Sequence, residues 1–225
     1  MKTALTRPIA TLALTALLLA LPATSAFAAD GSGFLADYSQ LKTVKDAQGV
    51  ERLLWVKDGV NFQNYDKILV EPIGFYPQPQ PSKEVSLGAL NDIKNYLDKL
   101  IPSIFGDSGV PVTTQPGSGV MRLRMAITAS SVDKGLQPYQ LIPVALIYTA
   151  ASRAAGTANY DAKLMVESEL LDSATGEPLA RIVRTAKKLE VKSGEQLTLK
   201  LAKPQLDAWA AALAEEVKLR RKPKP

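Results

Sequence analysis

Serine–lysine pairs are the residues of this chain that come nearest in type and spacing to a known catalytic pattern. Ser39 with Lys42 and Ser131 with Lys134 match S-x-x-K, and Lys192 begins a Lys-Ser-Gly sequence resembling the K-[ST]-G element of penicillin-recognising enzymes. That chemistry needs the serine at the start of a helix with the lysine one turn later. Ser131 instead follows a predicted strand, and Ser39 lies in a predicted lead-in segment. We therefore expect no catalysis from these pairs.

Paired carboxylates are a second candidate for catalysis. Glu167 and Glu169 alternate on one face of a predicted strand, and Asp172 and Glu177 flank the turn that follows. A glycosidase needs two carboxyl groups roughly 5–9 Å apart across a cleft. Alternating acids on a strand more commonly form a solvated face, and we interpret them so. The interval from Asp172 to Glu177 also lacks the ligand spacing of a calcium loop.

The chain contains no histidine and no cysteine. Ser-His-Asp and Cys-His nucleophiles are therefore excluded, as are the imidazole and thiolate ligands that zinc, copper and haem mostly use. An enzyme built from this inventory would depend on carboxylates, lysine, serine or tyrosine. We predict a protein without catalytic residues, metal or cofactor, and keep a His- and Cys-free enzyme as the less favoured alternative.

The first residues have the layout of a secretory leader. Lys2 and Arg7 are followed by the uncharged apolar residues 9–21, and then by an A-x-A cleavage pattern that ends at Ala28. The apolar run would form only about 20 Å of helix, too short for a hydrocarbon core of about 30 Å. We therefore expect a cleaved signal peptide and a periplasmic or secreted protein.

Loss of the leader removes Lys2 and Arg7 and lowers the formal net charge from +5 to +3. Nucleic-acid binding requires a clustered basic face with aromatic or groove-reading features, so we exclude nucleic acid as a partner. The remaining chain is long enough for one domain with its own core. The absence of a cysteine after the leader also removes the thiol that a lipid anchor would need.

Two segments have the apolar periodicity of amphipathic helices. The first is defined by apolar residues at intervals of three and four: Leu87, Leu90, Ile93, Leu97, Leu100, Ile101 and Ile104. Pro102 restricts the preceding residue and is expected to end or kink this helix. The second has one face made of Leu206, Trp209, Leu213 and Val217, with Pro204 in its first turn.

Strands are predicted at residues 53–56, 67–70, 121–129, 162–171 and 179–189. Turn residues separate the last two, which are expected to form an antiparallel hairpin. The predicted fold is α+β, a mostly antiparallel sheet of about five strands with two amphipathic helices packed on one face. The expected organisation is a signal peptide over residues 1–28, a lead-in segment with a short docking turn over 29–50, a single domain over 51–219 and a basic tail over 220–225.

Residues 135–152 form a segment without any charged residue. Its two prolines and two glutamines argue against a membrane-spanning helix. One interpretation is a buried connection or a short core helix. The other is an exposed apolar surface for an envelope protein, a lipid or an apolar ligand. The candidate interaction residues are Tyr139, Leu141, Ile142, Val144, Leu146, Ile147 and Tyr148.

Basic residues crowd the C-terminus. One interpretation is a polar tail whose cations suit the end of a helix. The other is a peripheral contact with anionic lipid or another acidic envelope polymer, which salt would weaken. The candidate contact residues are Lys218, Arg220, Arg221, Lys222 and Lys224.

Three stretches together resemble an uncharacterised family of exported bacterial proteins, domain of unknown function 3313 (DUF3313). They are residues 32–41 (SGFLADYSQL), 62–72 (FQNYDKILVEP) and 171–179 (LDSATGEPL), and they follow one another in the order expected for the family. Relatives in that family are often lipoproteins with a cysteine at the end of the leader, which this chain lacks. The resemblance implies a fold and a compartment, and no activity.

These observations favour an exported protein of the cell envelope that acts as a non-catalytic binding or accessory domain. The alternative is an envelope structural protein that contacts an anionic membrane or wall polymer through its basic C-terminus. The specific ligand or partner and the oligomeric state do not follow from the sequence.

Overall fold

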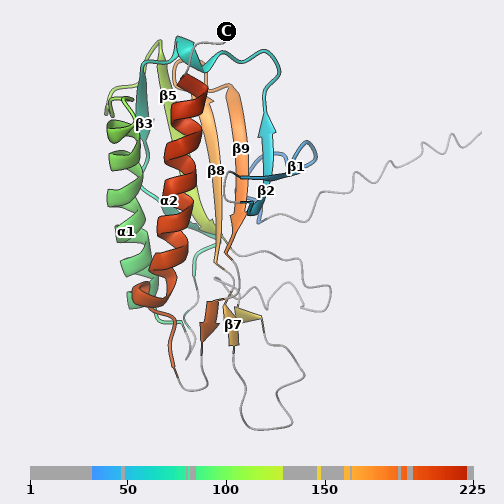
Figure 1. The fold of residues 1–225 in the computed structure, drawn as a ribbon, viewed down its shortest axis with the longest axis vertical. Helices are drawn as coiled ribbons and strands as arrows, with labels where there is room; N and C mark the ends of the chain where they lie inside the picture. The colour runs from blue at the N-terminus through green and yellow to red at the C-terminus, as the bar shows by residue number, and fades with distance from the viewer. Residues whose placement is uncertain are drawn as a thin grey trace, which may run out of the picture.

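The computed structural model describes residues 32–46, 49–79, 81, 85–128, 146–147, 160–162, 164–186, 189–191 and 195–221. They form a large twisted sheet with two helices side by side on one of its faces (Figure 1). The helices are α1 (Leu87–Asp107) and α2 (Leu199–Arg221), and a short 3-10 helix, η1, spans Phe62–Asn64. The strands of the large sheet are β1 (Lys42–Lys45), β2 (Glu51–Val56), β3 (Lys67–Val70), β4 (Gly74–Tyr76), β5 (Val120–Thr128), β8 (Met165–Asp172) and β9 (Pro178–Thr185).

The seven strands of this sheet run in the order β1-β2-β9-β8-β5-β3, and β4 continues alongside β5. All pairs are antiparallel except those that β3 and β4 make with β5. These pairs are parallel because α1 lies between them in the chain and carries it back across the sheet. The predicted α+β fold, with its helices on one face, is confirmed. The strand number exceeds the expected five because β1 and β4 are short edge elements without a clear period.

The hairpin of β8 and β9 is confirmed, and its turn explains why the strands pair there. The Asp172 carboxylate accepts hydrogen bonds from the backbone N–H groups of Ala174 and Thr175, at 2.9 and 2.8 Å. Gly176 follows with φ 75°, a conformation that favours glycine. These local interactions reverse the chain within the predicted turn residues.

Helix α1 is capped at its first turn and continues past the proline that was expected to end or kink it. The Ser86 hydroxyl accepts a hydrogen bond from the backbone N–H of Ala89 at 3.1 Å, which caps the first turn. Pro102 lies inside the helix, so of the two predicted alternatives, an end or a kink, the end is wrong. Ile104 and Phe105 beyond it are buried in the core, and this packing outweighs the lost backbone hydrogen bond.

Helix α2 is longer than predicted at both ends. It begins at Leu199, so Pro204 lies past its first turn, and it ends at Arg221, so the first two residues of the predicted basic tail are helical. Leu206 and Trp209 are buried against the core, as expected for the apolar face. Leu213 and Val217 on the same face are only half-buried.

A separate three-stranded sheet consists of β6 (Leu146–Ile147), β7 (Tyr160–Ala162) and β10 (Leu189–Val191), in the order β10-β7-β6. It contains two of the apolar residues predicted as an interaction surface. The other five, Tyr139, Leu141, Ile142, Val144 and Tyr148, lie outside the described residues. Whether this segment is a covered core or an exposed surface therefore stays a prediction.

Candidate functional site

The two faces of the large sheet carry different side chains because residues alternate along each strand. Towards the helices, the central strands present mostly apolar residues: Leu54, Val56, Met121, Leu123, Met125, Val166, Leu170, Ala180 and Ile182. The opposite face, called here the far face, carries buried charge at Glu167, Glu169 and Arg181. The two faces therefore hold two candidate sites.

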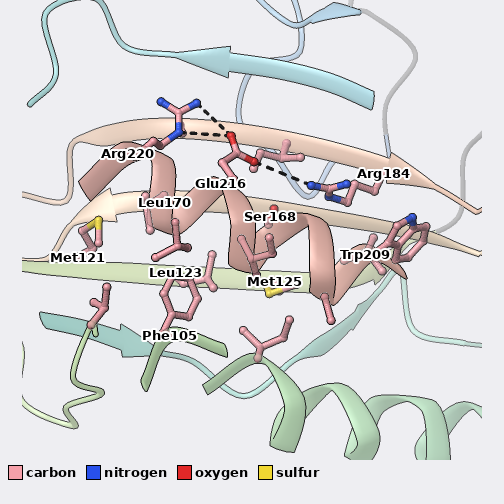
Figure 2. Close-up of a pocket in the computed structure, with 18 of the residues that line it drawn as sticks. Phe105, Met121, Leu123, Met125, Ser168, Leu170, Arg184, Trp209, Glu216 and Arg220 are labelled. Atoms are coloured by element: carbon pink, nitrogen blue, oxygen red, sulfur yellow. Dashed lines mark hydrogen bonds and ion pairs between the residues drawn. The ribbon is translucent and has the colours of Figure 1, made fainter. Parts of the chain in front are cut away.

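Between the sheet and the two helices lies a cavity of about 140 Å³, called here the α2 cavity. Figure 2 shows Phe105, Met121, Leu123, Met125 and Leu170 gathered around this space, with Trp209 from α2 beside them. Helix α2 contributes most of the roof: Leu206, Trp209, Ala210, Leu213, Glu216, Val217 and Arg220. The wall is mostly apolar, and the sheet contributes two polar side chains to it, Ser168 and Arg184.

The burial of the lining residues shows that the core is unfilled here. Leu54, Val56 and Ile182 point from the sheet towards α2 yet are only half-buried. Leu213 and Val217 on the helix are half-buried as well. Apolar side chains on facing walls of a well-packed core would cover one another. Helix α2 therefore leaves apolar surface beneath it that the described residues do not fully cover.

One side of the α2 cavity is charged, because Arg184, Glu216 and Arg220 line it. We call these three residues, together with Arg52, which is bonded to Glu216, the charged edge. The Glu216 carboxylate accepts two hydrogen bonds from Arg52, at 2.6 and 3.0 Å. It also accepts from Arg220 at 3.0 Å, and Arg184 lies 4.0 Å away (Figure 2). Arg184 donates to Asp46 at 3.1 Å. The charged edge thus links α2 to strands β2 and β9 and to the end of β1.

The electrostatics of the charged edge reflect crowded cations. Burial and the neighbouring Arg52 lower the pKa of Arg184 below its ordinary value, although Asp46 and Glu216 act in the opposite direction. Burial by itself would raise the pKa of Glu216, but the hydrogen bonds and charge of Arg52, with those of Arg220, lower it overall. Glu216 is therefore held as a carboxylate among three guanidinium groups.

A second cavity, of about 290 Å³, lies on the other side of the charged edge. Its lining includes Lys45, Asp46, Arg52 and Leu219, and it shares Glu216 and Arg220 with the α2 cavity. These two shared residues therefore separate an apolar space from a charged one. Arg220 is the more exposed of the two, with 36% of its side chain accessible against 17% for Glu216.

A tyrosine lines the α2 cavity beside η1, where Arg220 lies over the ring of Phe62. Tyr65 lines the cavity and donates its hydroxyl proton to Asp172 Oδ2 at 2.9 Å. Burial, followed by the hydrogen bond to Asp172, raises the pKa of Tyr65 to about 12. Its hydroxyl is thus a fixed donor that anchors η1 to the end of β8.

On the far face, the interpretation of Glu167 and Glu169 as a solvated strand face was wrong: Glu167 is 0% and Glu169 4% exposed. The cover is residues 32–41, called here the strap, in which Leu35 is buried. The Tyr38 hydroxyl donates to Glu167 Oε2 at 2.6 Å and accepts from the backbone N–H groups of Gly33 and Leu35, both at 3.0 Å. Burial and the bond to Glu167 raise the pKa of Tyr38.

The remaining far-face charges form a matched network. Arg181 Nε donates to Glu169 at 2.9 Å, and Arg124 donates to the other oxygen of Glu169 at 3.3 Å. Arg181 also lies over the ring of Trp55, 5.0 Å from its centroid, and Arg124 lies over Phe34 of the strap at 5.3 Å. Both carboxylates are thus engaged by side chains within the protein, which is the arrangement of a structural contact.

The other predicted site residues are dispersed. The Ser39 hydroxyl donates to Asp37 at 2.7 Å, while Lys42 lies on β1. Ser131, Lys134 and Lys192 lie outside the described residues. Lys218 lies 3.9 Å from Glu215, and Arg220 belongs to the charged edge; Arg221 is the last residue of α2, and Lys222 and Lys224 lie outside the described residues.

Sequence reasoning missed both the α2 cavity and the strap. The cavity depends on how far α2 stands from the sheet, which no periodicity encodes. A signal for the strap existed in the Phe34, Leu35 and Tyr38 spacing, which predicted a docking turn, but nothing local pointed to Glu167 as its partner. In the part of the chain that the structure describes, no group of three or more acidic side chains is placed to hold a metal ion. Neither described helix is long and apolar enough to cross a membrane.

Comparison with known proteins assigns the family. The model of DUF3313, a family described as proteins of unknown function, matches residues 30–213. The chain is 37% identical over 154 residues to the uncharacterised lipoprotein YdcL of Escherichia coli K12, covering 68% of this chain and 69% of that protein. Among solved structures it is similar to the PelC dodecamer from Paraburkholderia phytofirmans (12% identity, 77% and 99% coverage, TM-score 0.38) and a DUF4136 family protein from Bacteroides thetaiotaomicron (8% identity, 83% and 100% coverage, TM-score 0.37). The chain therefore belongs to the DUF3313 family.

Proposed function

We propose that this protein is an exported, non-catalytic binding domain of the bacterial cell envelope, and that its binding site for an apolar ligand is the α2 cavity. Export is supported by the leader-like first residues, which predict cleavage near Ala28, and by the lipoprotein relative. The expected first residue of the mature protein is then Ala29. Intact-mass measurement of the natively expressed protein checks this, and a chain that keeps Met1 would contradict it.

The observation that carries the binding function is the half-buried apolar surface beneath α2. Protein interiors contain few voids larger than a water molecule. An engineered apolar cavity of about 150 Å³ in another protein stays dry and binds benzene. The α2 cavity is of similar size, and its apolar lining offers water few hydrogen bonds. A slender apolar group placed there would cover surface from both walls and gain hydrophobic free energy.

A non-catalytic role is supported by the state of the candidate catalytic groups. Both far-face carboxylates are buried beneath the strap and bonded to protein side chains, where a substrate could not reach them without displacing Tyr38. The Ser39 hydroxyl is bonded to Asp37, not to a lysine. Of the partners predicted from the sequence, this arrangement favours an apolar ligand over a structural contact through the basic C-terminus.

The test uses N-phenyl-1-naphthylamine, a neutral apolar dye that fluoresces on leaving water. We expect saturable fluorescence with the native protein and at least a fivefold loss of affinity in Ala210→Leu, because that side chain lines the cavity and a larger one fills it. Ala211→Leu is the matched control, because Ala211 is next to Ala210 on α2 but is exposed and does not line the cavity. It should bind like the native protein.

A second variant fills the cavity from the opposite wall, so the test does not rest on one helix position. Ser168→Leu on β8 should also weaken dye binding, while circular dichroism shows that the fold is kept. Equal binding by the native protein and both filled variants would contradict the proposal, as would dye affinity too weak to saturate.

A further inference from the structure

The charged edge holds more cationic groups than it can match. Arg52, Arg184 and Arg220 share the carboxylates of Glu216 and Asp46, and Lys45 lines the same charged cavity. Arg52 Nε and Arg184 Nη2 are buried and have no hydrogen-bond partner in the described part of the protein. The side chain of Arg52 is only 8% exposed. Arg52 lines the space of about 290 Å³ and Arg184 lines the α2 cavity, so each cavity has one arginine with a buried donor that lacks an acceptor.

Unmatched buried guanidinium donors indicate an anion. A buried donor without a partner is unfavourable, and a guanidinium presents N–H groups in a fork that fits a carboxylate with two parallel hydrogen bonds. A purely structural cluster would be expected to balance its charges. The far face does so, since three guanidinium groups (Arg122, Arg124 and Arg181) lie against three carboxylates (Asp37, Glu71 and Glu169). Here a further acceptor would satisfy free donors and reduce the repulsion between cations.

The position of the charged edge determines what kind of anion fits. Glu216 and Arg220 line both cavities, so a molecule held there would have one part in apolar surroundings and another among guanidinium groups. This is the arrangement that recognises an amphiphile. The apolar space is small, which favours one chain over two and a compact headgroup over a bulky one.

We propose, building on the binding function above, that the ligand is a fatty acid of medium chain length. The end of its chain occupies the α2 cavity, the rest crosses between Glu216 and Arg220, which line both cavities, and its carboxylate is bound by Arg220 in front of Arg52 and Arg184. Arg220 is the residue that exchanges partners, because it is the most exposed arginine of the charged edge and belongs to the last turn of α2. Swinging from Glu216 towards the ligand, it would open the partition between the two cavities.

The experiment compares decanoate with decanol, which has the same chain and no charge, by displacement of N-phenyl-1-naphthylamine at pH 8. We expect decanoate to bind about tenfold more tightly, equal to about 1.4 kcal/mol. That preference should fall as salt is raised, because part of the charged edge is exposed. Arg220→Gln should reduce the preference, measured as the ratio of the decanol and decanoate dissociation constants of the same variant, to less than threefold. Lys218→Gln, which removes a charge two residues away on the same helix, should leave the preference intact.

The outcomes separate this inference from the binding function on which it rests. Equal affinity for decanol and decanoate would overturn the fatty acid and keep the apolar site. If neither decanol nor decanoate bound, both the fatty-acid inference and the apolar binding site would be contradicted. Tighter binding of decanoyl lysophosphatidic acid than of decanoate would contradict a fatty acid in favour of a phosphate-bearing lipid. An unchanged preference in Arg220→Gln would show that the carboxylate is bound elsewhere.

Discussion

The two faces of the large sheet bury charge in opposite ways. On the far face, Glu167 and Glu169 lie beneath the strap and are bonded to Tyr38, Arg124 and Arg181. On the helix face, Arg52 and Arg184 have donors without acceptors, and the apolar walls next to them are half-buried. A short segment of chain has closed one face, while a long helix has left the other partly open.

The comparison teaches that a cover's length does not determine how well it closes a surface. The strap is ten residues long, yet its tyrosine hydroxyl accepts from two backbone N–H groups of the strap and donates to Glu167 on the sheet. Helix α2 is rigid, so the gap beneath it cannot be filled by local adjustment of the backbone. A closed polar face is what stability requires, whereas an open apolar face beside guanidinium groups with unmatched donors is suited to binding.

The largest effect should come from Trp209, the largest side chain by which α2 contacts the core. Trp209→Ala should lower the free energy of unfolding by about 3–5 kcal/mol, because it deletes buried apolar atoms next to an existing cavity. Urea denaturation measures this. The same change at Trp55, half-buried under Arg181, should have a smaller effect of about 1–2 kcal/mol. A loss below about 1 kcal/mol for Trp209 would mean that α2 contributes little to stability.

The next effect concerns Glu216, which holds the charged edge together. Glu216→Gln should lower stability by about 3 kcal/mol at pH 7, the lower end for breaking a buried ion pair. Since the pKa of Glu216 is lowered by folding, its contribution is complete above the ordinary value of 4.5 and is lost as pH falls through the depressed pKa. The difference in the free energy of unfolding between the native protein and Glu216→Gln should therefore shrink as the pH falls below 4.5. A difference independent of pH would contradict this assignment.

A moderate effect is expected on the far face. Tyr38→Phe should lower stability by about 2 kcal/mol, because Glu167 and two backbone N–H groups lose their partner. Tyr76→Phe is the control: Tyr76 packs against Phe34 and is largely exposed, and its loss of a hydroxyl should change stability by less than about 0.5 kcal/mol. Protease digestion within the strap should accelerate in Tyr38→Phe alone. Identical behaviour of both variants would refute a sealing role for Tyr38.

The smallest effect is expected when an alanine beneath α2 is enlarged to leucine, and the same change on the far face provides the comparison. Ala210→Leu fills the α2 cavity and should stabilise the protein by about 0.5–1 kcal/mol. The same substitution at Ala126, buried on the far face, should destabilise it by about 1–3 kcal/mol through overpacking. Thermal unfolding of both variants provides the measurement. Destabilisation by more than about 1 kcal/mol at Ala210 would show that the space beneath α2 is too small for a ligand.

Much of the fold followed from local pattern. The alternation in β5 and β8, the turn residues around Asp172 and the apolar spacing of α1 and α2 identified the central elements and their layers. The helix does not end at Pro102, because the burial of Ile104 and Phe105 beyond it outweighs the local preference of the proline. Short edge strands such as β1 have too few residues for any period to be seen.

The candidate site followed from the sequence only in part. A non-catalytic binding domain was favoured by the inventory, but the predicted binding surface was sought in residues 135–152, not beneath α2. Leu213 and Val217 look like ordinary core residues in sequence, and only their incomplete cover reveals the cavity. Glu167 resembles a surface residue until Tyr38, distant in the chain, is placed against it.

Methyl NMR with 13C-methionine tests the central claim most directly, because the chain has reporters on both faces. Met121 and Met125 line the α2 cavity, and Met165 lies on the side of β8 that carries Glu167. Titration with decanoate should shift the Met121 and Met125 methyl signals in a saturable way and leave Met165 unchanged. Shifts confined to Met165, or no shift at any of the three, would contradict a ligand site beneath α2.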